Sequence, residues 1–362
     1  MKITTPLSEK IGLRLPIIQA PMAGGPSTQE LVAAVSAAGG LGSFGFAYMP
    51  PQEMQRQVAW VRAKTDRPFG VNVFVAELPG AIDAVSQRGA LEAVAGYYAE
   101  LGLPAPGPIN PPYGPDLDVQ LAAVEELRPR VFTTHFGSLP LEKVSSLQKL
   151  GILVGGSATC VAEAQRLESL GFDFVIAQGG EAGGHRGTYL RDPADALTGT
   201  LALTRLIVRA VKLPVVAAGG IMDGAGIAAV LALGAQAAQL GTAFLACPES
   251  GAPEVHKKML LSSPEDETRI TEKFSGRAAR GLVNRFIKEM ERAPSLAFPA
   301  QNAVTANLRA ASAKAGKPDF VSMWAGQAAP LARALPAAEL VARLEAETIE
   351  AVRNLKGVLR ES

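Results

Sequence analysis

Short apolar runs that alternate with longer stretches of helical periodicity constrain the fold of this chain more than any other feature. The runs cover residues 16–20, 41–47, 69–75, 131–136, 152–156, 172–177, 215–218 and 237–245. Helix-period stretches follow most of them, at residues 28–38, 52–64, 141–150, 161–170, 200–211 and 226–233. Apolar runs without alternation are typical of strands covered on both faces, as in parallel sheets. About eight strand–helix units therefore predict an α/β fold, a TIM (β/α)8 barrel, with a doubly wound parallel sheet as the alternative.

Two segments interrupt the alternation. After the third run come a helical stretch over about residues 81–101, a Pro/Gly-rich segment over 104–115 and a helix over 117–127. From about Gly251 the chain looks helical to its end. We therefore predict that residues 1–77 and 128–250 form the barrel. Residues 78–127 and 251–362 would form a second, mainly helical lobe over its mouth, with the last helix able to pack back on the barrel.

Composition and charge exclude several classes of function. The 362 residues carry 35 Lys+Arg against 34 Asp+Glu, a net charge of +1, which argues against a broad basic surface for nucleic acid or an anionic membrane. Two cysteines exclude a disulfide framework and a zinc site built on Cys pairs, and we predict no metal site.

The N-terminus lacks the apolar segment of a signal peptide. The uncharged segment 224–248 is divided by Gly234, which predicts a buried helix, turn and strand instead of a membrane span. We expect a cytoplasmic protein.

Polar residues and glycines cluster where the apolar runs end. Asn72, His135, Gln178 and His185 all fall in or just after the ends of such runs. In a barrel these ends converge on the face that carries the active site. Strand–helix turns need some glycine in any case, but the four polar side chains are not explained by turn geometry. We therefore predict that they share one site.

Backbone without bulky side chains marks the seventh and eighth runs. Gly219–Gly220 comes directly after run seven, and Gly241–Thr242 lies inside run eight. Barrels often bind phosphate after their seventh and eighth strands through backbone N–H groups. Glycine has no side chain, so it lets a phosphate come close to these groups. We predict a phosphate site here, with tight turns as the alternative. The glycine pattern of residues 40–45 is no dinucleotide fingerprint, because it follows a helix and lies inside an apolar run.

The three histidines differ in their settings. His185 lies among five glycines between Gly179 and Gly187. Such a loop is costly to order, and it surrounds a group that titrates near neutral pH, so we predict a functional role. His135 ends an apolar run, where a structural and a functional role remain equally open. His256 lies among lysines in the helical tail, where we predict that it is exposed to solvent.

Several motifs together resemble a known family. They are Ala20-Pro21-Met22-Ala23-Gly24-Gly25, Gly39-Gly40-Leu41-Gly42, His135-Phe136-Gly137 and the segment AQGGEAGGHRG from Ala177 to Gly187. These resemble the four signatures of class I nitronate monooxygenase, formerly called 2-nitropropane dioxygenase. Residues 217–224, 239–242, 275–281 and 324–327 also resemble that family, so the similarity spans nearly the whole chain. The loop around His185 is the specific part, since phosphate-binding glycines are shared by many FMN barrels.

The resemblance implies a barrel with FMN bound non-covalently at its mouth and a helical lobe over it. The implied FMN contacts are Ala20, Pro21, Met22, Ala23, Asn72, Gln178, Gly179, Gly183, Gly184, Gly219, Gly220, Gln239, Leu240, Gly241 and Thr242. His185 would be the catalytic base, and Arg186 would help to favour an anion through the field of the loop. His135, Tyr113 and Gly24 would line the substrate space.

The resemblance also implies the oxidation of nitronates, such as propionate 3-nitronate, by O2 to a carbonyl compound and nitrite through a flavin semiquinone. The partners would be a small-molecule nitronate and O2, in a monomer or a homodimer. Residues 297–308 lack the tyrosine and lysine that members of the family carry, and the second signature has the variant ending Ser43–Tyr48. These departures concern substrate size and polarity. The alternatives are an FMN-dependent NAD(P)H reductase of an enoyl-thioester or a quinone and, in another class, a non-catalytic flavin- or phosphate-binding barrel.

Overall fold

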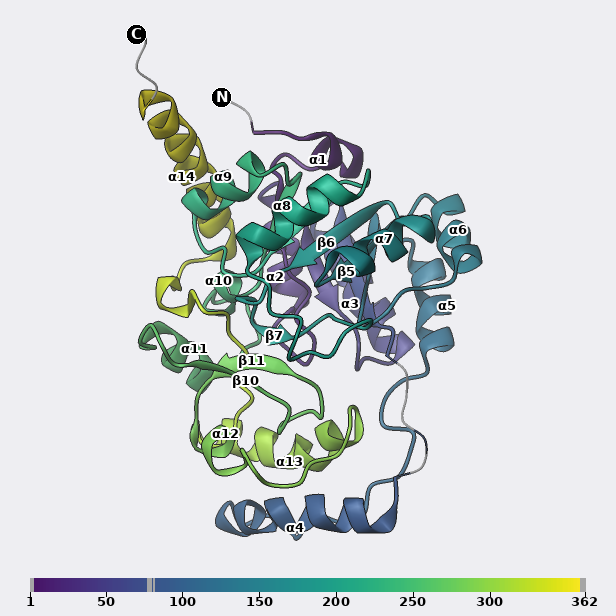
Figure 1. Cartoon of the computed structure of the whole chain (residues 1–362), viewed down its shortest axis with the longest axis vertical. Helices are drawn as coiled ribbons and strands as arrows, with labels where there is room; N and C mark the ends of the chain where they lie inside the picture. The colour runs from purple at the N-terminus through teal and green to yellow at the C-terminus, as the bar shows by residue number, and fades with distance from the viewer. Residues whose placement is uncertain (1–2, 77–79, 81, 359–362) are drawn as a thin grey trace.

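Eight parallel strands form a ring in the upper half of the molecule (Figure 1). The computed structural model describes residues 3–76, 80 and 82–358. The strands are β1 (Ile17–Gln19), β2 (Gly42–Gly45), β3 (Phe69–Phe74), β4 (Val131–His135), β5 (Leu153–Ala158), β6 (Phe174–Gln178), β8 (Val215–Ala218) and β9 (Ala237–Leu240). They pair in the order β1-β9-β8-β6-β5-β4-β3-β2, and a parallel bridge between Ile18 and Leu41 closes the ring. The predicted barrel is confirmed, and the doubly wound sheet is excluded because its edge strands would not meet.

Helices cover the outside of the ring. They are α2 (Gln29–Ala37), α3 (Pro51–Lys64), α5 (Leu117–Leu127), α6 (Leu141–Lys149), α7 (Val161–Ser169), α8 (Thr200–Ala210) and α9 (Gly224–Ala232). Capping side chains set the starts of α5 and α9, where Asp116 accepts from Val119 N (3.1 Å) and Asp223 accepts from Gly226 N (2.9 Å). The apolar sides of these helices pack on the strands. This two-sided cover explains why the strands occur as unbroken apolar runs.

Helix α5 belongs to the barrel, although its sequence position predicts the lobe. Its residues Leu121, Val124 and Leu127 are buried in the core between strands and outer helices, and the helix contacts α3 and β3. The Pro/Gly-rich segment therefore ends the excursion into the lobe before α5 begins. The predicted boundary between residues 77 and 78 and the predicted helix start at residue 81 lie outside the described residues. Within them, α4 (Ala84–Glu100) begins after the N-cap Asp83.

Both terminal helices pack on the barrel. Helix α1 (Pro6–Ile11) covers the end opposite the strand carboxyl termini, where Leu7 and Ile11 join a cluster with the inward-facing Phe174 and Val216. Helix α14 (Ala337–Val358) contacts α9 and α2, and its Leu344 is fully buried. The last helix thus completes the outer layer of the barrel, while the segment before it reaches over the mouth.

The lobe combines helices with a small antiparallel sheet. Its helices are α4, α11 (Glu254–Leu261), α12 (Arg285–Glu289) and α13 (Ala300–Lys314), and Figure 1 shows α4 at the outer edge beyond α13. The sheet has the order β10 (Thr268–Thr271), β11 (Ala279–Leu282) and β7 (Gly184–His185). The prediction that the chain is helical from Gly251 onward is therefore wrong over β10 and β11. Neither strand is an apolar run, and β11 is held by pairing with the barrel's own glycine-rich loop.

The uncharged segment 224–248 forms a helix, a turn and a strand, as predicted, and then one further helical turn. These elements are α9, β9 and α10 (Thr242–Leu245). The strand ends at Leu240 because the backbone of Gly241 is already helical, with φ −103° and ψ −67°. Among the residues described here, no helix is both long and apolar enough to cross a bilayer.

Candidate active site

A cavity of about 410 Å³ lies between the carboxyl ends of the barrel strands and the lobe. Small-molecule and cofactor sites typically occupy about 300–1,000 Å³. The predicted residues that line this cavity are Ala20, Pro21, Met22, Ala23, Gly24, Asn72, His135, Gln178, Gly183, Gly184, His185, Gly219, Gly220, Gln239, Gly241 and Thr242. Further lining residues come from α11, α13 and the segment 321–328. Barrel closure therefore brings most of the predicted residues to one place.

Three predicted contacts lie outside this lining. A Cβ at Gly179 would lie 2.5 Å from the backbone of Thr200, so this glycine is required by its contact with α8. Leu240 is 1% exposed and packs in the core of the barrel wall. Tyr113 packs against the hydrophobic cluster of the lobe that includes Phe274. Tyr113 therefore does not line this cavity, and its predicted place in the substrate space stays a prediction.

The ends of β8 and β9 present bare backbone to the cavity. Gly219 and Gly220 have left-handed φ values of +121° and +68°, which residues with side chains rarely adopt. Gly241 and Thr242 line the same cavity at the start of α10. A phosphate held by backbone N–H groups needs this kind of access. The two strand ends therefore have the access that a phosphate group requires, and turn geometry alone does not explain why both open onto one cavity.

Gln178 holds the upstream part of the loop that carries His185. Its Nε2 donates to His185 O (2.9 Å), and Gly187 N donates to its Oε1 (2.7 Å). On the other side of the loop, β7 pairs with β11, with His185 opposite Ala279. Gln178 thus lines the cavity and also determines where the backbone of His185 lies.

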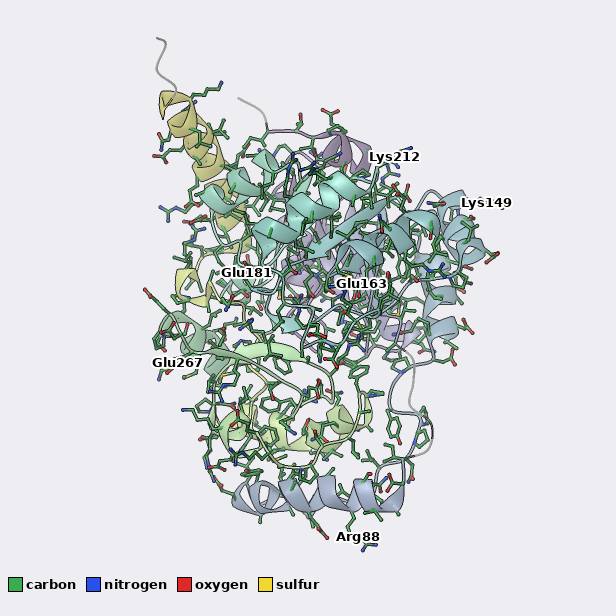
Figure 2. All side chains as sticks on the ribbon, in the orientation of Figure 1. Arg88, Lys149, Glu163, Glu181, Lys212 and Glu267 are labelled. Atoms are coloured by element: carbon green, nitrogen blue, oxygen red, sulfur yellow. The ribbon has the colours of Figure 1, made fainter. Side chains whose placement is uncertain are left out.

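Glu163 anchors the downstream part of the same loop. This buried carboxylate of α7 accepts hydrogen bonds from Thr188 Oγ1 (2.8 Å), Tyr189 N (2.7 Å) and Leu190 N (3.0 Å). Figure 2 shows Glu163 and Glu181 at the end of the barrel that faces the lobe. A glycine-rich loop loses much conformational entropy when it is ordered. Hydrogen bonds to side chains of the barrel, such as Glu163, therefore offset part of the entropy that this loop loses.

Arg186 does not line the cavity. Its side chain is fully buried, and its guanidinium donates to Gly179 O (2.6 Å), Gln178 O (2.9 Å) and Ala196 O (2.8 Å). Burial lowers the pKa of Arg186 to about 10, so it stays charged at neutral pH. Nη1 and Nη2 of Arg186 thus hold the backbone of the loop, and an effect of Arg186 on an anionic ligand would act only through its charge.

His185 and His135 meet on the cavity wall as neutral imidazoles. Burial is the main cause that lowers the pKa of His185 to about 3 and the pKa of His135 to about 4. His135 uses both ring nitrogens within the protein, with Nδ1 2.8 Å from Ser157 Oγ and Nε2 3.2 Å from His185 O. His185 uses Nε2, which lies 2.8 Å from Ser275 Oγ. His135 therefore has both ring nitrogens bonded within the protein, whereas Nδ1 of His185 has no partner among the described residues.

His256 is buried, although its lysine-rich surroundings predict exposure. It is 3% exposed and lines the cavity from α11, and burial lowers its pKa to about 4. His256 and Leu260 are one helical turn apart on the face that α11 turns toward the protein. This spacing is the sequence signal that could have predicted burial.

Arg309 is a cavity residue that sequence analysis missed. It projects from α13 and lines the cavity. Its guanidinium donates to Thr305 Oγ1 (3.1 Å) and to Asn302 Oδ1 (2.8 Å). Among the described residues, no carboxylate forms an ion pair with it. Residues 297–308 contain neither tyrosine nor lysine, and Arg309 is the next residue in the chain.

A strand ring whose carboxyl ends converge on a cofactor-sized cavity is the architecture of (β/α)8-barrel enzymes, and this chain is one of them. Residues 5–347 match the family model described as nitronate monooxygenase. That match covers almost the whole chain. The protein therefore belongs to the nitronate monooxygenase family.

Relatives of known name agree with this assignment. A nitronate monooxygenase of Paraburkholderia phytofirmans is 44% identical, covering 96% of this chain and 95% of that protein. A nitronate monooxygenase of Pseudomonas aeruginosa is 43% identical, covering 95% and 99%. The solved structure of a nitroalkane oxidase from Streptomyces ansochromogenes superposes with a TM-score of 0.90 at 43% identity, covering 96% of this chain and 99% of that one.

Proposed function

We propose that the cavity binds FMN and that the protein oxidises nitronates, such as propionate 3-nitronate, with O2 to a carbonyl compound and nitrite. One observation carries this proposal: a single cavity joins the bare backbone at the ends of β8 and β9 to the neutral imidazole of His185. The backbone at Gly219, Gly220, Gly241 and Thr242 would hold the phosphate. Bound FMN supplies the redox chemistry between nitronate and O2. The names of the relatives, nitronate monooxygenase and nitroalkane oxidase, support the same substrate class.

His185 would accept a proton from the α carbon of a neutral nitroalkane and so generate the nitronate within the cavity. The ring is neutral at pH 7 because its pKa lies well below its ordinary value, so its lone pair is available. A pKa of about 3 makes the free imidazole a weak base. The nitronate that forms is an anion, and a negative charge next to the ring stabilises the imidazolium and raises its pKa. Proton transfer is therefore coupled to the binding of the anionic product.

Aromatic rings around His185 keep this part of the cavity apolar. The ring centroids of Phe136 and Trp324 both lie 5.5 Å from that of His185. The centroid of Phe298 lies 6.0 Å from it, and that of Phe74 lies 6.1 Å from it. Water that would solvate an anion is displaced from such surroundings, and each remaining electrostatic interaction is strengthened. An anionic substrate is therefore stabilised here only where a hydrogen-bond donor or a positive charge of the protein contacts it.

Arg309 is expected to bind the carboxylate of a substrate such as propionate 3-nitronate. We predict that Arg309→Met lowers kcat/KM for this substrate by about 30-fold or more, because a desolvated, hydrogen-bonded charge pair contributes about 2–5 kcal/mol. The nitronate of a simple nitroalkane carries no carboxylate, so its kcat/KM should fall much less. Oxygen consumption with both substrates measures the difference.

Arg309→Lys is the matched control, because it keeps the positive charge and removes the planar guanidinium. This variant should retain more activity on propionate 3-nitronate than Arg309→Met. An equal fall for both substrates in Arg309→Met would contradict a role for Arg309 in binding the carboxylate.

Spectroscopy of the purified protein tests the proposed function against its alternatives. We expect the visible absorption of bound FMN. Without O2, adding a nitronate should change this absorption, whereas NADH should not bleach it quickly. Rapid bleaching by NADH with no response to a nitronate would support the reductase. A colourless protein that takes up no flavin on reconstitution would contradict FMN binding and favour the non-catalytic barrel.

A further inference from the structure

Ser275 belongs to the lobe but contacts the barrel loop that carries His185. It lies in the turn between β10 and β11, is 1% exposed, and places its Oγ 2.8 Å from His185 Nε2. The same Oγ lies 3.1 Å from Arg277 O. A serine hydroxyl has one proton to donate and two lone pairs that accept. A carbonyl oxygen can only accept, so the bond to Arg277 O uses the proton of Ser275, and the bond to His185 must use a lone pair.

We propose that Ser275 fixes the tautomer of His185, with the ring proton on Nε2 and the free lone pair on Nδ1. Within the described part of the chain, Nδ1 has no hydrogen-bond partner, and the side chain lines the cavity. The bond made by one ring nitrogen determines which nitrogen carries the proton. Ser275 is therefore a positioning residue for proton abstraction, and this inference rests on the function proposed above.

The turn that carries Ser275 is tied to α13. Thr305 Oγ1 donates to Phe274 O (2.6 Å), and Gln301 Nε2 donates to Lys273 O (2.9 Å). These carbonyls belong to the two residues that precede Ser275 in the chain. The hydroxyl is therefore held by the lobe, while the imidazole is held by the barrel loop. The packing of the lobe on the barrel thus determines which ring nitrogen of His185 is free.

The proton transfer explains why this arrangement favours the reaction. Nδ1 takes the proton from the α carbon, the electron pair of the C–H bond forms the C=N bond of the nitronate, and the negative charge moves to the nitro oxygens. The ring becomes an imidazolium, and its Nε2–H bond to Ser275 becomes charge-assisted and stronger. If Ser275 instead donated to Nε2, formation of the imidazolium would leave the Nε2–H group facing the serine O–H group, and two donors cannot form a hydrogen bond with each other. The proposed tautomer therefore stabilises the charged state that the reaction creates.

Nitrogen NMR of the FMN-loaded protein with 15N-labelled histidine tests the tautomer directly. The chain has three histidines, so His185 is assigned by the signals that disappear in His185→Asn. In the wild-type protein we expect a protonated Nε2 and an unprotonated Nδ1 for His185. In Ser275→Ala the other tautomer should become populated. A wild-type His185 with its proton on Nδ1, or a tautomer unchanged by Ser275→Ala, would overturn the proposal.

Ser157→Ala is the matched control for the NMR experiment, because Ser157 Oγ makes the equivalent contact with His135 Nδ1 at 2.8 Å. Removing this hydroxyl should change the signals of His135 and leave the tautomer of His185 as in the wild type. If Ser157→Ala shifts the tautomer of His185 as much as Ser275→Ala does, the effect is not specific to Ser275 and the proposal fails.

Kinetics add a second readout. Ser275→Ala should lower kcat/KM for nitroethane about tenfold, the usual effect of one hydrogen bond, and leave oxidation of the preformed nitronate nearly unchanged. Ser275→Thr keeps the hydroxyl and should restore most of the loss. An equal loss on both substrates would indicate a merely structural residue and contradict the proposal. If the wild type oxidises no nitronate at all, the proposed function fails, whereas the NMR result still decides the role of Ser275.

Discussion

His185→Asn is expected to lower kcat/KM for a neutral nitroalkane such as nitroethane by about 10²- to 10⁴-fold, the usual contribution of a positioned general base. Oxidation of the preformed nitronate should change far less, because that substrate has already lost its proton. Asparagine keeps a polar side chain of similar reach but cannot accept the proton. The expected result is therefore a selective loss, and the ratio of the two kcat/KM values is the quantity to measure.

Oxygen consumption with both forms of one substrate gives this ratio, and the flavin spectrum of the variant shows that the cofactor is still bound. Losses of equal size on nitroalkane and nitronate would contradict the role of His185 as a base. The pH profile adds a second check. Because the pKa of His185 is lowered to about 3, kcat/KM for the nitroalkane should show no inflection near the ordinary histidine pKa of 6.5.

Acidification from about pH 7 to about pH 5 is expected to lower the free energy of unfolding by about 5–6 kcal/mol. Burial holds the pKa of His135 and His256 at about 4 and that of His185 at about 3, against 6.5 for an ordinary histidine. Below pH 6.5 the unfolded chain binds protons that the folded chain does not, so stability falls as the pH falls. Each neutral histidine accounts for nearly 2 kcal/mol of this loss at about pH 5. The loss levels off near the folded pKa values.

Urea denaturation at saturating FMN, at several pH values between about 7.5 and 5, measures this loss. His256→Gln removes one of the three titrating groups without touching the proposed proton acceptor. The variant should lose about 2 kcal/mol less than the wild type between about pH 7 and pH 5. A free energy of unfolding that is level over this range would show that the three imidazoles have the same pKa in the folded and the unfolded chain, and would contradict their lowered pKa values.

The barrel could be predicted because its signal is local and repeated. Strands covered on both faces must be apolar throughout, and the helices between them carry their own caps, as Asp223 does for α9. The lobe was less predictable. The hairpin of β10 and β11 has no apolar run, and the Pro/Gly-rich segment before α5 interrupts the alternation, which predicts the lobe for a helix that packs on the barrel.

The half of the candidate site that lies on the barrel could also be predicted. The carboxyl ends of parallel strands meet at one face whatever the detailed packing, so residues as distant in sequence as Asn72 and Gly220 line the same cavity. The half that lies on the lobe could not. Arg309 and His256 reach the cavity, and Ser275 reaches His185, only because α11, α13 and the hairpin dock on the barrel, and no local pattern specifies that docking.

The amino-acid sequence alone determined the barrel, its glycine-bearing rim and the histidine loop, because each follows from periodicity or backbone requirements within a short segment. Only the tertiary structure decided what each polar side chain does. Arg186 donates to three backbone carbonyls, His135 has both ring nitrogens bonded, and His185 contacts a serine from the lobe. The physical reason is that a side chain's role depends on which partners satisfy it, and those partners come from segments far apart in the sequence.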